Sequence, residues 1–458
     1  GFITALLLCY PIFLVFFPIS VLPLEETVNF ADLLNFNQLL IALFIISFVT
    51  YATWQLRLLL KTLSTNLFIL LAALIAIPFI GVYPGDADDF FTNFWYAERV
   101  LNLNENPYQT EHYQENYGNH QSDLPGISPA PFLPYGPLWL GTQTIIYAAI
   151  NSLSIVPKVL IYKTIQFFLW LITLYVVDKL IDHIKPESKE LFRPILLSPW
   201  LLLAMVGTAH NDLWMLLLIT LSVSFLYQKK YFLSLSVLLI SVFFKYITLV
   251  LIPIFILHWL RHSQIPTKLT KQYIGVSALL LICLFALFEY SLGIFSGIFN
   301  QAGLSGYSLT YGLSLLFRES NLPFIQQSLY PFIFFGLYGW IIYRFWESER
   351  SFENVITSSA LTIGASFIFV TQLWGYWYLV WIIPLLLFFS QKTLKFFYLL
   401  GSAHVILFFW LWTLFKANRI NQLGTEQFYF FAPTLMISLT LTLFIFLVQL
   451  WNNSKITD

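Results

Sequence analysis

The chain has 458 residues, of which 58% are hydrophobic and only 10% are charged, and its mean hydropathy is +0.75. A soluble domain carries about 25% charged residues, so this composition excludes an ordinary soluble protein and indicates a membrane protein. The 23 basic and 23 acidic residues balance, and no basic run is interleaved with aromatics, which excludes a nucleic-acid-binding surface.

Long apolar runs dominate the chain, and backbone polar groups in hydrocarbon must pair within their own segment, so such runs predict membrane-spanning helices. We expect an all-α, polytopic transmembrane bundle of about fourteen spans, within a range of about 12 to 15. The first run lacks a basic leading segment and a small-residue cleavage site, which favours a retained helix over a signal peptide. The predicted helices cover residues 2–22, 38–56, 66–83, 159–180, 193–208, 211–227, 232–245, 247–260, 273–290, 326–345, 354–371, 376–390, 394–415 and 428–450.

The run 137–150 is apolar but too short to span, so we expect an interfacial or re-entrant helix there. Cytoplasmic loops of membrane proteins are enriched in Lys and Arg, and this bias favours a topology in which the loop 84–136 lies outside and both termini lie inside. Sixteen of the 23 basic residues then lie inside: Arg57, Lys61, Lys179, Lys185, Lys189, Arg193, Lys229, Lys230, Arg261, Lys268, Lys271, Arg344, Arg350, Lys392, Lys395 and Lys455.

Three polar turns converge on the outer side in this topology. The acidic run Gly85-Asp86-Ala87-Asp88-Asp89-Phe90 follows the third helix, His210-Asn211-Asp212 lies between two later helices, and Lys245-Tyr246 lies between the next two. Carboxylates at a membrane edge resist desolvation and repel one another, so they indicate a functional site. Such a site suits a negatively charged lipid head group together with a hydroxyl nucleophile.

Sugar transfer from a polyprenyl phosphate carrier needs this set of groups. An attacking hydroxyl requires a carboxylate as general base, and Asp88 or Asp89 can supply it. The departing lipid phosphate gains charge, and Lys245 can stabilise that charge. Neighbouring carboxylates, including Asp86, would raise the proton affinity of the base.

The same residues resemble a known family. The run from Asp88-Asp89 to Trp95, then Asn106-Pro107-Tyr108 and Pro134-Tyr135-Gly136-Pro137-Leu138, is similar to the bacterial polytopic mannosyltransferases of the GT-C superfamily, which are glycosyltransferase family 87-like. Ala209-His210-Asn211-Asp212-Leu213 is similar to the Gly-His-Asn-Asp turn of that group, and Phe244-Lys245-Tyr246 to its later Lys turn. The resemblance covers about residues 84 to 260.

The resemblance implies an inverting mannosyl or hexosyl transferase (EC 2.4) whose catalytic acid lies in the first outer loop. The donor would be a polyprenyl-phosphate-linked sugar, and the acceptor a lipid or glycan at the extracytoplasmic face of a cell membrane, expected to be a bacterial inner membrane. By this resemblance Asp88 or Asp89 is the base, and Lys245 faces the carrier phosphate. The expected substrate-binding residues are Tyr108, Tyr135, His210, Asn211, Asp212, Lys245 and Tyr246.

The chain departs from the family pattern at two places, and it divides into three expected parts. Thr92-Asn93 stands where the group has Arg-Tyr, and Tyr96-Ala97 where it has Asp-Gly. We expect two additional helices in 1–65, a catalytic module with the outer loop 84–136 in 66–260, and variable helices in 261–458. No cofactor is indicated with certainty, although the acids leave open a divalent metal.

Each signal also has a plainer interpretation. The acids can be a solvated helix end or a calcium-binding turn, His210 and Asp212 can cap a helix, and Lys245 can snorkel to the interface. The run Trp374-Gly375-Tyr376-Trp377-Tyr378 is typical of an aromatic belt at the outer interface, and it can also flank the point where the lipid carrier enters.

Two other functions compete with the transferase. A secondary transporter would hold its acids near the bilayer midplane and show an internal repeat, and no repeat is evident. A polymerase or ligase of lipid-linked glycans would present several arginines in a large outer loop, whereas this loop holds only Arg99 against eight acids.

Overall fold

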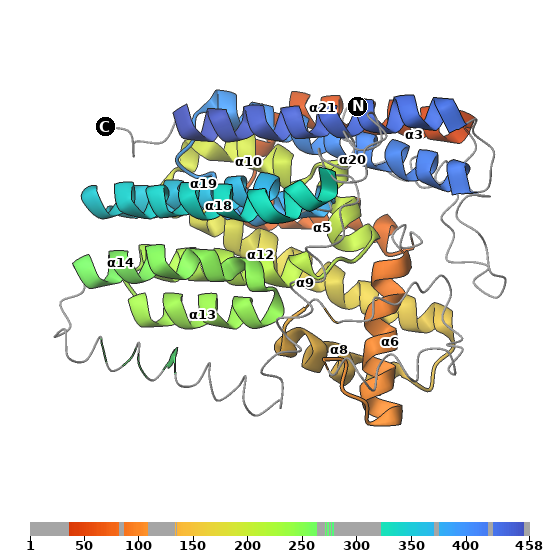
Figure 1. The fold of residues 1–458 in the computed structure, drawn as a ribbon, viewed down its shortest axis with the longest axis horizontal. Helices are drawn as coiled ribbons and strands as arrows, with labels where there is room; N and C mark the ends of the chain where they lie inside the picture. Colours follow the sequence, from red (N-terminus) through yellow and green to blue (C-terminus); the bar gives the residue numbers. More distant parts are fainter. Residues whose placement is uncertain are drawn as a thin grey trace.

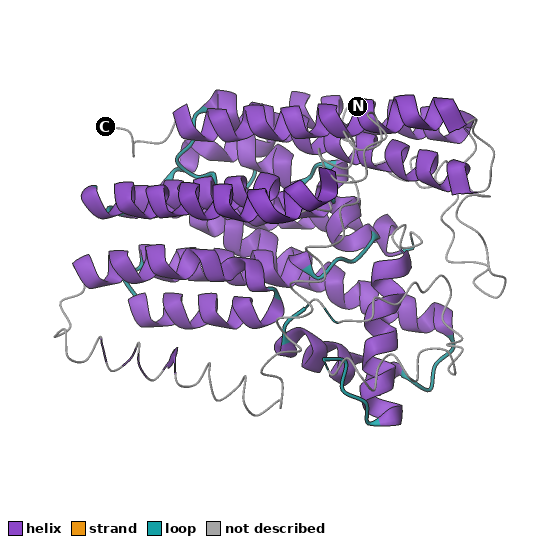
Figure 2. Cartoon of the chain, viewed as in Figure 1, coloured by secondary structure: helices purple, strands orange, loops and turns teal. Residues whose placement is uncertain are grey.

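The structure is a computed structural model in which the described residues form helices and connecting turns, with no strand among them (Figure 2). It describes residues 36–81, 87–108, 133, 135–262, 271, 273, 275, 277, 278, 322–370, 375–419 and 425–452. The predicted all-α class is confirmed for this part of the chain. The helices predicted at 2–22 and 273–290 lie outside the described residues, the first wholly and the second almost wholly.

Most of the predicted apolar runs form helices close to their predicted limits (Figure 1). The first group is α3 (Phe36–Gln55), α4 (Arg57–Thr62), α5 (Thr65–Ile80), α6 (Ala87–Leu103), α8 (Pro137–Ile150), α9 (Ile155–Ile184), η1 (Pro186–Ser188), α10 (Lys189–Leu196), α11 (Pro199–Leu202) and η2 (Leu203–Gly207). The second group is α12 (Asp212–Tyr227), α13 (Tyr231–Phe244), η3 (Tyr246–Leu251), α14 (Ile252–His262), α18 (Leu322–Glu347), α19 (Phe352–Phe369), η4 (Tyr376–Leu385), α20 (Gln391–Arg419) and α21 (Thr425–Asn452).

The number of helices that can cross a membrane is smaller than expected. Among the described residues, α9 and α19 are long and apolar enough, and a bent pair, Pro186–Leu196 with Pro199–Gly207, would make a third. Several other apolar helices have 10 to 17 residues. At a rise of about 1.5 Å per residue these fall short of a hydrocarbon layer about 30 Å thick. The expected count of about fourteen spans is not confirmed.

The single helix predicted at 193–208 is wrong. The segment is broken into α10, α11 and the π-helical turn η2, and its two arms are bent by 61°. Pro199 lacks an N–H and disfavours a helical conformation in the residue before it, so the break falls directly ahead of it. At the break, the Ser198 hydroxyl donates to the Ile195 carbonyl at 2.6 Å.

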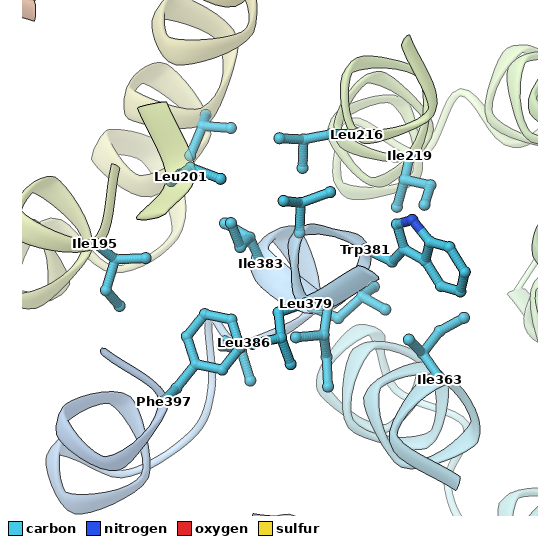
Figure 3. Close-up of a cluster of buried hydrophobic side chains, with 14 of the residues drawn as sticks. Ile195, Leu201, Leu216, Ile219, Ile363, Leu379, Trp381, Ile383, Leu386 and Phe397 are labelled. Atoms are coloured by element: carbon cyan, nitrogen blue, oxygen red, sulfur yellow. The ribbon is translucent and has the colours of Figure 1, made fainter. Parts of the chain in front are cut away.

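The short helix η4 lies in the middle of the main apolar core. Figure 3 shows Leu379, Trp381 and Ile383 of this segment surrounded by side chains from other helices. Its neighbours include α12, α19 and α20. The sequence predicts an α-helix over 376–390, but the described segment is 3-10 helix from Tyr376 to Leu385. A 3-10 run of this length is uncommon.

One end of the bundle is held by a buried ion pair between α9 and α10. The Arg193 guanidinium donates to both carboxylate oxygens of Asp178, at 2.8 Å each, and both side chains are fully buried. Arg193 also donates to the Leu63 carbonyl at 2.7 Å, and Thr65 donates to Asp178 at 2.7 Å. The pair therefore fixes the start of α5 against α9.

Replacing Arg193 with methionine tests this anchor. Because the change leaves the Asp178 carboxylate buried without its main partner, we expect a loss of about 3 to 5 kcal/mol in folding free energy. The control is Lys61→Met, which breaks a more exposed contact to Glu190 at 3.3 Å and should cost under about 1 kcal/mol. Thermal unfolding of the detergent-solubilised protein measures both, and equal losses would contradict the anchor.

Candidate active site

The first residue of α12 pairs with the residue that ends α13. The Lys245 ammonium lies 2.8 Å from Oδ1 of Asp212, whose side chain is fully buried. The same Oδ1 accepts a short hydrogen bond from the indole N–H of Trp381. Lys245 can reach Asp212 because α12 and α13 form a tight antiparallel hairpin, which brings the start of one helix beside the end of the other.

Aromatic rings surround the Lys245 ammonium. Nζ lies 4.7 Å from the ring centre of Tyr378, 4.9 Å from that of Trp381 and 5.6 Å from that of Tyr135. Tyr378 and Trp381 are three residues apart in η4, and a 3-10 helix places such residues on one face. Cations are attracted to ring faces at these distances, so the rings help hold the Lys245 ammonium in its position.

Two residues of the run 374–378, Tyr376 and Trp377, do not lie in an aromatic belt. Tyr376 and Trp377 are buried, and Trp377 stacks on His210 with 4.0 Å between ring centres and a 16° interplanar angle. The prediction of a membrane-interface belt is therefore wrong for these two residues, and Trp374 lies outside the described residues. Sequence reasoning missed the contribution of η4 to the site, because its many aromatic residues look the same in a belt and in a core.

The Asn-Pro-Tyr and Tyr-Gly-Pro motifs of the loop 84–136 contact the turn at Lys245-Tyr246. The Tyr108 hydroxyl donates to the Tyr135 carbonyl at 2.8 Å, and the Tyr246 hydroxyl lies 3.4 Å from the same oxygen. The Gly136 N–H donates to the Phe244 carbonyl at 3.2 Å. The structure thus brings together the Asn-Pro-Tyr, Tyr-Gly-Pro and Lys-Tyr motifs that the sequence singled out. In this arrangement Tyr108 supports the loop.

The helix α6 carries the acidic run and packs on α8 at the site end of the bundle (Figure 1). The Trp139 indole donates to the Asn93 side-chain oxygen at 3.0 Å. Burial, with the charge of Glu98 and a hydrogen bond to it, raises the pKa of Tyr147 to about 12, so this phenol stays protonated. The hydrogen bond from Trp139 gives Asn93 a structural role. Asn93 is one of the positions at which the chain departs from the family pattern.

The structure describes the acidic run only in part. Asp86 lies outside the described residues, and Asp88 and Asp89 are described by their backbone alone. Phe79, near the end of α5, lies beside Gly207, where an added Cβ would come within 3.4 Å of its ring. Phe90 and Phe91 share one apolar cluster with Ala209 and Phe244. The residues that directly follow Asp88 and Asp89 in α6 therefore pack together with residues next to the His-Asn-Asp and Lys turns.

The turn before α12 is conformationally constrained. Ala209 has φ 55°, a left-handed conformation that favours glycine, and it directly follows Thr208 and the π-turn η2. His210, Asn211 and Asp212 are all buried. Asp212 begins α12, as the capping interpretation expects, but its Oδ1 is hydrogen-bonded to Lys245 and Trp381.

Metal binding stays untested at the acids. Among the residues whose side chains the structure describes, no group of three His, Cys, Asp or Glu side chains is arranged to hold a metal ion. The acidic run falls outside that set, so the expectation of a possible divalent metal stays a hypothesis.

Apolar helices of this kind, with a buried polar cluster at one end, are typical of an integral membrane protein. Residues 19–261 match the family model described as alpha-(1->6)-mannopyranosyltransferase, N-terminal domain. The matched region is more than half of the chain, and the chain belongs to this family, whose members are mannosyltransferases of the GT-C type. No curated protein and no solved structure matches the chain.

The family assignment confirms the resemblance found in the sequence, and the matched region is wider than the motifs themselves. The chain is a mannosyl-transferring glycosyltransferase of the membrane, and it requires a sugar donor and an acceptor. The matched region ends at residue 261, so η4 and its Trp381 lie outside it.

Replacing Gly136 with alanine tests the contact between the loop and the lysine turn. A Cβ there would lie 2.0 Å from the Phe243 carbonyl oxygen, so the loop must separate from α13 and carry Tyr135 away from Lys245. We expect at least a tenfold loss of transfer activity together with a lower unfolding temperature. The control is Gly141→Ala in α8, where nothing lies within 4 Å and the change should stabilise by about 0.5 to 1 kcal/mol. Wild-type activity in G136A would contradict this packing.

Proposed function

We propose that the protein moves a hexose, expected to be mannose, from a polyprenyl phosphate carrier to a lipid or glycan acceptor, with inversion, at the extracytoplasmic face. The observation that carries the proposal is the convergence of the start of α6, the Asp212 turn and Lys245 at one end of the bundle. Those three segments are far apart in sequence, and each holds a group that this reaction needs.

The acidic run supplies the base in this proposal. The acceptor hydroxyl attacks the anomeric carbon while Asp88 or Asp89 takes its proton, and a single displacement inverts the configuration. Three neighbouring carboxylates, with Asp86 the third, repel one another, and this repulsion favours a base that accepts a proton near neutral pH.

Lys245 faces the carrier phosphate in this proposal. An ammonium has three N–H donors, and the Asp212 bond uses one of them. The remaining donors can bind phosphate oxygens, which gain negative charge as the sugar leaves, so the ammonium stabilises the transition state more than the ground state. The rings of Tyr378 and Trp381 keep the ammonium in place.

The charge distribution along the helices supports an extracytoplasmic site. Asp212 begins α12, and Tyr227 at its other end donates to the His183 carbonyl, beside Lys185 and Lys189. That end also carries Lys229 and Lys230. By the positive-inside rule the basic end faces the cytoplasm, and the site then faces outward.

The competing functions have weaker support. Arg99, the arginine that a glycan polymerase or ligase would need in the outer loop, is buried and forms an ion pair with Glu105. A secondary transporter would not explain the match to a mannosyltransferase family. We therefore retain the transferase.

The proposal is tested with purified protein in lipid vesicles, supplied with polyprenyl phosphate mannose and a lipid acceptor. Asp88→Asn and Asp89→Asn remove the two candidate bases, and one of them should lower kcat by about 100-fold or more while donor affinity stays within about threefold. Glu187→Gln, an exposed acid at the basic end, is the matched control and should leave the rate unchanged.

Two results would overturn the proposal. Full turnover by both aspartate variants would remove the acidic run from catalysis. Absence of mannosyl transfer by the wild-type protein, together with ion-coupled solute uptake into the same vesicles, would favour the transporter.

A further inference from the structure

Two buried polar atoms beside the Lys245 ion pair lack hydrogen-bond partners among the described residues. They are Nδ2 of Asn211, a donor, and Oδ2 of Asp212, an acceptor. Both side chains are more than nine-tenths buried, and they belong to consecutive residues at the start of α12. A buried polar atom without a partner costs free energy, so such a pair points to a ligand group that supplies the missing bonds.

The carboxylate of Asp212 is hydrogen-bonded through one oxygen, while the other is buried without a partner among the described residues. Oδ1 accepts from both the Lys245 ammonium and the Trp381 indole. Those two bonds come from α13 and η4, on separate segments of the chain, and they fix the orientation of the carboxylate. Oδ2 is thus left without a partner among the described residues, and Trp381 acts as a positioning residue for it.

The donor Nδ2 of Asn211 and the acceptor Oδ2 of Asp212 together indicate which ligand group would pair with them. A phosphate oxygen could accept from Asn211 but would be repelled by the Asp212 carboxylate. A hydroxyl satisfies both, since it donates its hydrogen to Oδ2 and accepts from Nδ2. The position therefore suits a sugar hydroxyl and disfavours a phosphate.

We propose that Asn211 and Asp212 form a subsite that binds the donor hexose through the hydroxyl next to its anomeric carbon. In this subsite the Trp381 indole N–H fixes the orientation of the Asp212 carboxylate. The inference rests on the proposed function, in which Lys245 binds the carrier phosphate. The Lys245 ammonium is bonded at 2.8 Å to Oδ1 of the same carboxylate, so a phosphate bound to it would bring its sugar beside Asp212, and the C2 hydroxyl is next to the anomeric carbon that the phosphate carries. The subsite would thereby distinguish sugars by their C2 hydroxyl.

The test compares two donors, polyprenyl phosphate mannose and its 2-deoxy analogue, in the vesicle assay. We expect the wild-type kcat/KM to favour mannose by about 100-fold, because the analogue leaves both protein atoms unpaired. Asn211→Ala should reduce that preference to below about tenfold. The ratio of the kcat/KM values for the two donors does not depend on how much of a variant folds.

The Trp381→Phe variant tests the positioning role with the ring preserved. It removes the N–H that donates to Asp212, and we expect the mannose preference to fall at least fivefold. Trp214→Phe is the matched control, because this tryptophan lies in α12 near Asp212 and its buried indole N–H has no acceptor among the described residues. W214F should keep the wild-type preference. If Asn211→Ala does not fold, Trp381→Phe and its control carry the test.

Failure of this inference and failure of the proposed function give different results. If the wild-type protein does not transfer mannose at all, the proposed function is wrong, and the subsite falls with it. If it transfers mannose and 2-deoxymannose equally well, or if N211A and W381F keep the wild-type preference, the function stands and the subsite is wrong.

Discussion

The site depends on one buried carboxylate. Asp212 is fully buried at the start of α12, and its Oδ1 holds both the Lys245 ammonium and the Trp381 indole. A buried charge is tolerated only when it is paired and hydrogen-bonded, so Asp212 obliges α13 and η4 to stay in contact with α12. The family match ends at residue 261, so this contact joins the matched region to the part of the chain beyond it.

A second buried ion pair, between Arg193 and Asp178, stabilises the opposite end of the helix bundle. Arg193 and Asp178 hold the starts of α5 and α10 against α9, and α5 runs from there toward the site, with the acidic run following its end. The two buried pairs thus lie at opposite ends of the same bundle. One end gathers basic residues around a structural anchor, and the other gathers the polar residues of the site, so the bundle is electrostatically asymmetric along its helices.

The sequence predicted the all-helical class, most helix limits and the meeting of the His-Asn-Asp turn with the Lys-Tyr turn, because hydrophobic runs and ordered polar turns are local signals. It mispredicted 193–208 as one helix, because Pro194 is accommodated inside α10 whereas Pro199 follows a break, and the two prolines look alike in the sequence. It also mispredicted Tyr376 and Trp377 as a belt and could not identify Trp381 as a site residue. The 3-10 conformation of η4 aligns Tyr378 with Trp381, and the segment lies among side chains of other helices in the core (Figure 3), a placement that its own residues do not reveal.

The central claim is that Asp212 and Lys245 form one energetic unit, and a double-mutant cycle on thermal unfolding measures it directly. Asp212→Asn and Lys245→Met each leave a charged partner without its counter-charge, whereas the double variant leaves neither. The account predicts that the double variant is no less stable than either single variant, with a coupling free energy of at least about 1.5 kcal/mol. Additive losses in the double variant would contradict it.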